Sequence, residues 1–334
     1  MIFADLLRPP GPNDRLAASY KDWLHLNVFD AATGIAIVLN GAVQGAADDP
    51  RAVVSTTALV HHAGRWSTYH ETVSRSQTTI TERTLAVGDQ LVVQLDPVSG
   101  GMTTTFRHPT SGLAVHIEAV PRTRVIQTVA PMPFGSGWIA WRATPLLRSK
   151  GYMEAPGRRI SLDDALAYHD HNWGRWHWGE DIGWEWAAWP SEHGALVMSR
   201  ATDRAHGQGA ANVTIALPAR HGWLNRSYGG SSVEVRLASW RRGCSRRLPG
   251  AMAALHAERS SPRLPGTIEL RVDDGFDRMT ARLQVEDAIQ LIVADPQLPG
   301  YSYIHEMFGP FRASGMRGGE RFAFHGRGVF EYVD

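Results

Sequence analysis

The sequence has little of several features that mark particular classes of protein. Its 334 residues contain one cysteine, Cys244, so no intrachain disulfide can form. The formal net charge at pH 7 is +1, which creates no long-range field to attract nucleic acid or an anionic membrane. No run approaches the roughly 20 apolar residues of a membrane-spanning helix. We therefore expect no disulfide framework, no nucleic-acid partner and no transmembrane segment.

Cys244 lies in a basic run, between Arg241-Arg242 and Arg246-Arg247. Neighbouring cations lower the pKa of an exposed thiol, so the run predicts an exposed cysteine with a lowered pKa. No base accompanies the thiol, and we do not expect it to be catalytic. The arginines carry no interleaved aromatic residues, and we interpret them as charge on a solvated loop.

Targeting and nucleotide-binding signals are also missing from the sequence. Asp5 and Arg8 interrupt the region where a secretory signal needs an apolar run. A cytoplasmic location is therefore the expectation. The glycines Gly315, Gly318 and Gly319 lack the lysine and following helix of a phosphate-binding loop. Neither does the sequence contain the Gly-x-Ser-x-Gly turn of a hydrolase nucleophile.

The sequence does contain many short apolar runs separated by turn residues, which is typical of antiparallel strands. Thr267–Val272 alternates apolar and polar residues most clearly, and such alternation buries one face of a sheet, as a closed barrel requires. Helical periodicity is confined to Leu248–Glu258 and at most one turn at Asp163–Tyr168. Strands are expected at residues 34–39, 52–60, 91–95, 113–120, 137–141, 184–189, 195–199, 212–217, 233–237, 267–272, 279–285, 290–293 and 329–333.

The two halves of the chain resemble each other faintly. Trp23–Phe29 leads to Gly34 and an apolar run, and Trp184–Trp189 leads to Gly194 and a second apolar run. Each block is interpreted as a tryptophan-anchored strand, a turn and an apolar strand. Because the length favours two domains, two copies of a barrel explain both the echo and the length. We predict an all-β protein of two antiparallel barrels packed together, with domains at 1–175 and 176–334.

Aromatic residues concentrate after residue 167. Six of the 12 tryptophans lie between Trp173 and Trp189. As a strand, this segment would place His169, His171 and Trp173 on one face and Tyr168, Asp170 and Asn172 on the other. Aromatic surface with a few convergent polar groups is typical of a small-molecule site. The alternative is a junction between domains, with the tryptophans as core.

A metal site at the same segment is a rival interpretation. His169 and His171, with His177 nearby, could supply imidazole ligands, and Asp170 or Glu180 could support them. A tryptophan-rich environment disfavours an ion unless the ion is fully coordinated. We therefore expect no metal and no cofactor.

The segment Tyr168-His-Asp-His-Asn-Trp-Gly174, followed by a tryptophan-rich strand, resembles the signature of the AttH-like and carotenoid 1,2-hydratase (hydroxyneurosporene synthase) proteins. Gly326–Glu331 is similar to the glycine-rich closing strand of that group. The resemblance implies two lipocalin-like barrels and a hydrophobic ligand, isoprenoid, carotenoid or polyketide-like. It also implies that His171 and Trp173 occupy functional positions. Members of the group hydrate an isolated alkene of an acyclic carotenoid, and relatives include fungal phytoalexin hydratases and pericyclic cyclases, so the fold is better specified than the reaction.

A hydratase needs an acid that stays neutral until it is used, and burial beside aromatic rings raises a carboxyl pKa. Asp170 is the expected acid, with Asp203 and Glu185 as further candidates. The ring faces of Trp173, Trp184 and Trp186 would stabilise the carbocation. A neutral His171 would orient and deprotonate the water.

The hypothesis is therefore an enzyme that binds a hydrophobic small molecule at the junction of the barrels and performs acid-assisted hydration, isomerisation or cyclisation. Asp170, His171 and Trp173 are the expected catalytic residues, and the expected substrate contacts are Tyr168, Asn172, Trp184, Trp186 and Asp203. A lipocalin-type carrier without catalysis is the alternative. Under that alternative, Asp170 accepts backbone N–H groups at a turn and His171 is a core histidine.

Overall fold

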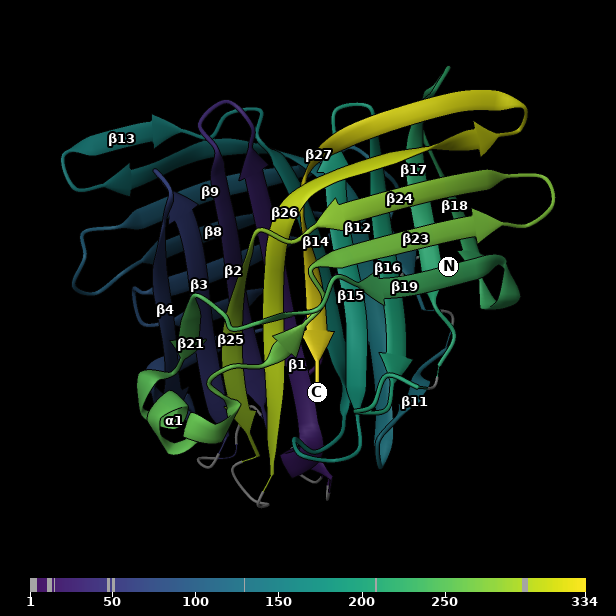
Figure 1. Cartoon of the computed structure of the whole chain (residues 1–334). Helices are drawn as coiled ribbons and strands as arrows, with labels where there is room; N and C mark the ends of the chain where they lie inside the picture. The colour runs from purple at the N-terminus through teal and green to yellow at the C-terminus, as the bar shows by residue number, and fades with distance from the viewer. Residues whose placement is uncertain are drawn as a thin grey trace. The chain divides into compact units, whose positions relative to one another are not determined.

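The computed structural model describes residues 5–10, 14, 16–46, 49, 52–128, 130–207, 209–295 and 300–334. These residues are almost entirely β structure, as predicted (Figure 1). The chain divides into two compact units, Met1–His177 and Trp178–Asp334, and each contains its own large, mainly antiparallel sheet. The boundary of independently folding domains at 175/176 stays a prediction.

The first unit contains the 3-10 turns η1 (Ala17–Ser19) and η2 (Arg75–Gln77) and the strands β1 (Tyr20–Asp30), β2 (Ile35–Gln44), β3 (Val53–His62), β4 (Arg65–Ser74), β5 (Thr78–Ile80), β6 (Thr84–Val87), β7 (Leu91–Asp96), β8 (Gly101–Arg107), β9 (Ala114–Pro121), β10 (Ile126–Gln127), β11 (Met132–Phe134), β12 (Gly137–Ala155), β13 (Arg158–Ser161) and β14 (Leu166–Arg175). The main path of the sheet runs β4-β3-β2-β1-β14-β12-β9-β8-β7-β6-β5.

The connection between the two edge strands explains why this sheet curls. Strands β4 and β5 are the two ends of the path, yet only η2 separates them in the sequence. The four steps from Ser74 to Thr78 span at most roughly 14 Å. The sheet must therefore curve until its edges approach, which gives a nearly closed barrel.

The core of the first unit is built from alternate residues of its strands. On β1, Leu24, Leu26 and Val28 are at most 1% exposed and belong to one apolar cluster. Leu7 joins that cluster from outside the sheet, and its N–H donates to the Glu82 carbonyl at 2.8 Å. The segment before β1 therefore contributes to the filling of the barrel.

The second unit contains the helix α1 (Gly250–Leu255), the 3-10 turns η3 (Gly230–Ser232) and η4 (Ala257–Arg259) and the strands β15 (Gly183–Ser191), β16 (Gly194–Thr202), β17 (Asn212–Ala219), β18 (Gly222–Gly229), β19 (Val233–Ala238), β20 (Arg241–Arg242), β21 (Arg246–Leu248), β22 (Arg263–Leu264), β23 (Thr267–Asp273), β24 (Arg278–Gln284), β25 (Asp287–Ala294), β26 (Tyr301–Arg317) and β27 (Glu320–Val333). The main path of its sheet runs β18-β17-β16-β15-β27-β26-β24-β23-β19.

The two sheets share one plan. In both, a run of four consecutive strands ends at an edge, a 3-10 turn leads to the opposite edge, and the last strand returns to pair with the first. Strand β15 therefore has the place of β1, and β27 has the place of β14. The faint echo between Trp23–Phe29 and Trp184–Trp189 is the sequence trace of this repeated plan.

The glycines of the closing strand β27 make room for a core tryptophan. Trp189 is fully buried, and its ring lies 5.6 Å from the Phe311 ring, centroid to centroid. A Cβ atom on Gly328 would lie 2.5 Å from Cδ1 of Trp189. Because such a contact is not tolerated, the tail Gly326–Glu331 needs glycine at that position.

The helical predictions agree with the structure, and the prediction for Cys244 does not. The predicted helix at Leu248–Glu258 is present as α1 and η4, and Asp163–Tyr168 contains a turn from which β14 begins at Leu166. Cys244 is half-buried against the second core. Burial raises the pKa of its thiol in spite of the nearby Arg247, so the prediction of an exposed, acidified cysteine is wrong.

Within the described ranges, no helix combines the length and hydropathy needed to cross a membrane. The cytoplasmic location stays a prediction.

Candidate functional site

Strand β14 is the centre of the first sheet and carries the predicted motif. It pairs with β1 on one side and β12 on the other. His171 lies opposite Leu24 and Arg142, and His169 lies opposite Leu26. Because directly opposite residues share a face, the two histidines point toward the apolar core together with these leucines.

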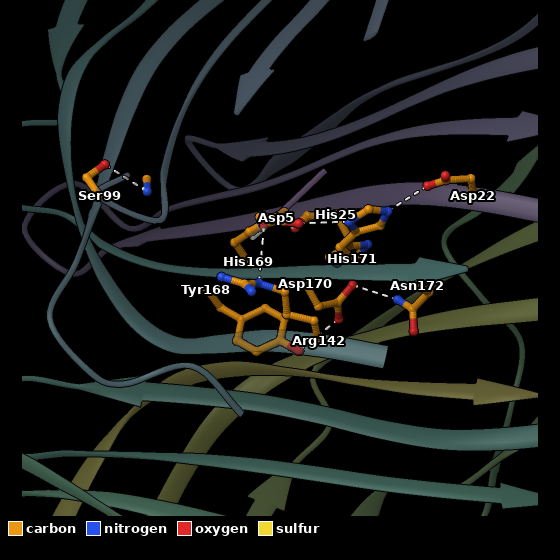
Figure 2. Close-up of polar contacts among 11 residues, drawn as sticks. Asp5, Asp22, His25, Ser99, Arg142, Tyr168, His169, Asp170, His171 and Asn172 are labelled. Carbon is orange, nitrogen blue, oxygen red and sulfur yellow. Dashed lines mark hydrogen bonds and ion pairs between the residues drawn. The ribbon is translucent and has the colours of Figure 1, made fainter. Parts of the chain in front are cut away.

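Two aspartates hold the histidines on this inner face (Figure 2). Asp5 contacts His169 Nε2 through Oδ2 at 2.9 Å and His171 Nδ1 through Oδ1 at 2.8 Å. His171 Nε2 contacts Asp22 Oδ1 at 2.6 Å. His169 Nδ1 donates to the carbonyl of His25 at 2.9 Å. Asp5, Asp22, His169 and His171, at most 3% exposed, are called the inner cluster below.

The contacts of the inner cluster define how many protons it holds. Each of the four joins a ring nitrogen to an oxygen, so each needs one hydrogen. Two neutral imidazoles supply two hydrogens, and two further protons must reside on the rings or the carboxyl groups. With them, the two aspartates and two histidines carry no net charge together. A neutral total is what a low-dielectric interior favours.

The pKa values indicate where these protons lie. Burial alone would lower the pKa of His171, but the charge and hydrogen bond of Asp22, followed by those of Asp5, raise it to about 9. Burial opposes the ionisation of Asp5, yet hydrogen bonds from His169 and His171 hold its pKa well below the usual 3.8. The Asp5 carboxylate thus contacts both rings, at His169 Nε2 and His171 Nδ1. His171 is an imidazolium between two carboxylates.

Further groups extend the cluster toward Trp173. Arg142 Nε lies 3.7 Å from Asp5 Oδ2, and the Tyr20 hydroxyl and Arg8 N–H both donate to Asp22 Oδ2, at 3.1 and 2.8 Å. The Trp173 ring, which is half-buried, lies 5.1 Å from the His171 ring. The Arg8 guanidinium lies 4.5 Å from the Trp173 ring centroid. Positive groups therefore surround Trp173.

Asp170 lies on the opposite, outer face of β14 (Figure 2). Its Oδ2 accepts a hydrogen bond from the Tyr168 hydroxyl at 2.8 Å, and its Oδ1 accepts one from Asn172 Nδ2 at 2.7 Å. Tyr168 and Asp170 are at most 3% exposed. The structure thus brings together three predicted residues on this face, as the alternation of the motif indicated, and separates Asp170 from His171 and Trp173.

His25 is the neighbour of Asp170 on β1. Its Nε2 contacts Asn27 Oδ1 at 2.8 Å, and its Nδ1 contacts Asn40 Nδ2 at 3.4 Å. Burial lowers the pKa of His25 to about 4. The outer face therefore carries a neutral imidazole, whereas the inner face carries a charged one.

The remaining predicted residues belong to the second unit. The indole N–H of Trp184 donates to Glu331, and Trp186 is 6% exposed on the same strand, β15. Asp203 follows β16 and accepts a hydrogen bond from the Gly207 N–H at 2.9 Å. Asp203 thus anchors a turn. The proposed substrate contacts of these residues, and a ligand at the junction of the two halves, stay predictions.

Sequence reasoning missed Asp5, Asp22 and Arg142. Asp22 carried a usable signal, since it directly precedes the predicted strand Trp23–Phe29, alternates with Tyr20 and Leu24, and is charged where those neighbours are apolar. Asp5 lies in a segment without periodicity and carried none. Arg175, at the end of the motif strand, pairs with Asp14.

Among the described residues, no group of three or more His, Cys, Asp or Glu side chains is arranged to hold a metal ion. In the inner cluster, the imidazole nitrogens face oxygen atoms at hydrogen-bond distance. The predicted ligands His169 and His171 are thus engaged in an ion-pair network.

Comparison with solved structures identifies the fold of the chain. No family model matches the sequence, and no curated protein matches it. Among solved structures, the chain is similar to a protein assigned as AttH from Nitrosomonas europaea (TM-score 0.66, 12% identity, 98% of each chain covered). It is also similar to kievitone hydratase from Nectria haematococca (TM-score 0.62, 15% identity, 99% of this chain and 97% of that one). A third is CghA with Sch210972 (TM-score 0.59, 13% identity, 100% and 94%). The chain therefore has the AttH-like fold that its motif implied.

Proposed function

We propose that the chain is an enzyme that hydrates, isomerises or cyclises a neutral, largely apolar small molecule by proton transfer, with β14 at its reaction centre. One similar fold is that of a hydratase and another that of a protein solved with a small molecule. The observation that carries the proposal is the fully buried His171 ring, whose two nitrogens contact the carboxylates of Asp5 and Asp22. Burying such charges costs stability unless they are paired, and perturbed groups of this kind concentrate at functional sites.

The acid strength of His171 limits the range of possible substrates. An acid with a pKa of about 9 does not protonate an isolated alkene, because catalysis needs a donor matched to its acceptor. It does match an enolate or phenolate oxygen. The structure therefore favours a substrate whose reacting double bond is conjugated to an oxygen function over the isolated alkene of a carotenoid.

The charges around Trp173 support the same choice. Arg8 lies over the Trp173 ring, and the His171 imidazolium lies beside it. These cations would destabilise a substrate carbocation that lies against the Trp173 ring. They stabilise negative charge that develops on a substrate oxygen. In this proposal the substrate lies against the half-buried Trp173, and its oxygen takes the place of one carboxylate oxygen at a His171 N–H. His171 gives that proton to the substrate oxygen and takes it back when the product forms, while Asp5 and Asp22 hold the ring.

The test begins with native mass spectrometry and solvent extraction of the purified protein to recover a bound scaffold. Conjugated enones and phenols related to that scaffold are then incubated in ¹⁸O-labelled water and in D₂O, and isotope incorporation is measured. Asp22→Asn should lower turnover by roughly 10²-fold or more while the ligand still binds. The control is Asp277→Asn in the second unit, where a buried aspartate accepts from the Tyr228 hydroxyl at 2.7 Å; it should leave turnover unchanged.

Asp170→Asn distinguishes the two faces of β14. Loss of turnover in this variant, with Asp22→Asn active, would move the chemistry to the outer face. A protein that retains a ligand and incorporates no isotope in any variant or in the wild type would be a carrier, and the enzyme proposal would be wrong.

A further inference from the structure

The second unit carries a polar group of its own at the place that corresponds to the inner cluster. Tyr332 on β27 lies opposite Glu185 on β15 and His305 on β26. In the first unit, His171 lies in the same way between residues of β1 and β12. Both barrels therefore place ionisable residues around the strand that closes them. Glu185 and His305 are at most 1% exposed.

His305 has the contacts of a structural histidine. Its Nδ1 donates to the Tyr332 carbonyl at 3.1 Å, and its Nε2 accepts from Gln290 Nε2 at 3.1 Å. The amide of Gln290 is oriented by Arg247, whose Nε donates to Gln290 Oε1 at 2.7 Å. Both ring nitrogens are satisfied, and burial lowers the pKa of His305 to about 4.

His206 differs from His305 because one of its two ring nitrogens has no hydrogen-bond partner among the described residues. Its Nδ1 lies 3.0 Å from Glu185 Oε1, and its ring stacks on the Tyr332 ring with centroids 3.8 Å apart. Its side chain is 6% exposed. In the part of the chain that the structure describes, His206 Nε2 is buried and has no hydrogen-bond partner. A buried polar atom without a partner is rare enough to need an explanation, and a binding role is one.

Several contacts hold His206 in an uncommon conformation. Its φ is +56°, in the left-handed region that non-glycine residues rarely occupy. Its N–H donates to the Asp203 carbonyl at 3.1 Å, and its carbonyl accepts from Arg200 Nη2 at 3.1 Å. Such conformations persist where the surroundings enforce them and concentrate at ligand sites. Asp203 therefore contributes by positioning the loop that carries His206.

The chemistry of the pair indicates what it binds. The Glu185 carboxylate accepts the Nδ1 hydrogen, which leaves Nε2 as the ring nitrogen that can still contact a ligand. Arg200 Nη1 lies 3.3 Å from both Glu185 oxygens and balances their charge. A hydroxyl group both donates and accepts, so it can pair with this nitrogen whether or not the nitrogen carries a hydrogen. The Trp240 ring, 40% exposed, lies edge-on to Tyr332 with centroids 6.4 Å apart, which suits an aromatic ligand.

We propose that Glu185, His206 and Tyr332 form a second ligand site, within the second unit, for a neutral phenol-type molecule whose hydroxyl forms a hydrogen bond with His206 Nε2. The loop that carries His206 is exposed on both sides of it, at Ala205 and Gly207. Because His206 Nε2 is buried, binding requires this loop to move enough to admit the hydroxyl. The site is independent of β14 and of the proposed reaction there.

Phenol itself is the probe, and the histidine side-chain ¹⁵N resonances of the full-length wild-type protein are the readout. The expected result is a saturable shift of His206 Nε2 during a phenol titration, without a shift of His305 Nε2, which already accepts a hydrogen bond. Glu185→Gln should weaken phenol binding at least tenfold, because the ring loses its fixed tautomer. A His206 Nε2 resonance that does not move up to the solubility limit of phenol would overturn the proposal. Equal shifts at His206 and His305 would overturn it too, since they would show non-specific binding.

Discussion

The ion pair between His171 and Asp22 makes a prediction about stability and pH. In the folded chain, burial opposes the charge on His171, but Asp22 and then Asp5 outweigh it and raise the pKa to about 9 from the ordinary 6.5. A histidine whose pKa is raised on folding stabilises the protein fully below pH 6.5. That stabilisation is lost as the pH rises through 9. The wild-type protein should therefore become less stable between pH 6.5 and 9.5.

The magnitude follows from the two pKa values. Each pH unit between them lowers the free energy of unfolding by at most about 1.4 kcal/mol, so the window removes about 3 kcal/mol. His171 is fully buried, and solvent screening does not reduce this figure much. The pKa values of His25 and His305 are lowered to about 4. Their contributions to stability therefore vary below pH 6.5 and do not add to the loss between pH 6.5 and 9.5.

Asp22→Asn is the informative variant, because Asp22 makes the largest contribution to the raised pKa of His171. Urea unfolding at pH 6.5 and 9.5, followed by tryptophan fluorescence, should show that the variant loses less than half of the roughly 3 kcal/mol that the wild type loses. The control Asp277→Asn should keep the wild-type pH dependence. Equal losses in wild type and Asp22→Asn would refute the assignment of the imidazolium.

Four further predictions concern packing and reactivity. A Cβ on Gly174 would lie 2.2 Å from the Trp138 carbonyl oxygen, so Gly174→Ala should cost roughly 3 kcal/mol or more in thermal unfolding. Gly157→Ala, which meets no atom within 4 Å at a φ of +74°, should cost only about 1 kcal/mol. Trp189→Ala removes a fully buried ring and should destabilise the protein by about 4 kcal/mol in the same assay. Cys244, whose thiol pKa is raised by burial, should react with iodoacetamide at pH 8 more slowly than free cysteine; a faster reaction would contradict the burial of the thiol.

Local patterns predicted those features that local sequence controls. Alternation placed strands at segments such as Thr267–Val272 and divided the motif of β14 into its two faces, because side chains of a strand alternate strictly. Of the two long strands, β12 was predicted only at residues 137–141 and β26 was not predicted at all. Polar stretches of these strands, such as Arg312–Arg317, show no regular spacing of apolar residues. They form β structure because they pair with neighbouring strands.

The partners of the motif could not be predicted in the same way. Asp5 contacts His169 across 164 positions of the sequence, and no periodicity marks such a contact. The sequence showed His171 beside Asp170 and suggested that they act together. In a strand, adjacent residues point to opposite sides, so the carboxylate groups that contact His171 had to come from another part of the chain.

The pairing of first with last strand also orders the events of synthesis. Strand β1 pairs along most of its length with β14, and β15 pairs with β27. Contacts so distant in sequence form late, because loop closure costs entropy before pairing repays it. As the chain leaves the ribosome, β1 cannot form this pairing until β14 has been synthesised. Strand β14 also brings His169 and His171 to Asp5 and Asp22. Closure of the first barrel and assembly of the inner cluster are thus one late step, and a nascent chain cannot hold the cluster before its barrel is complete.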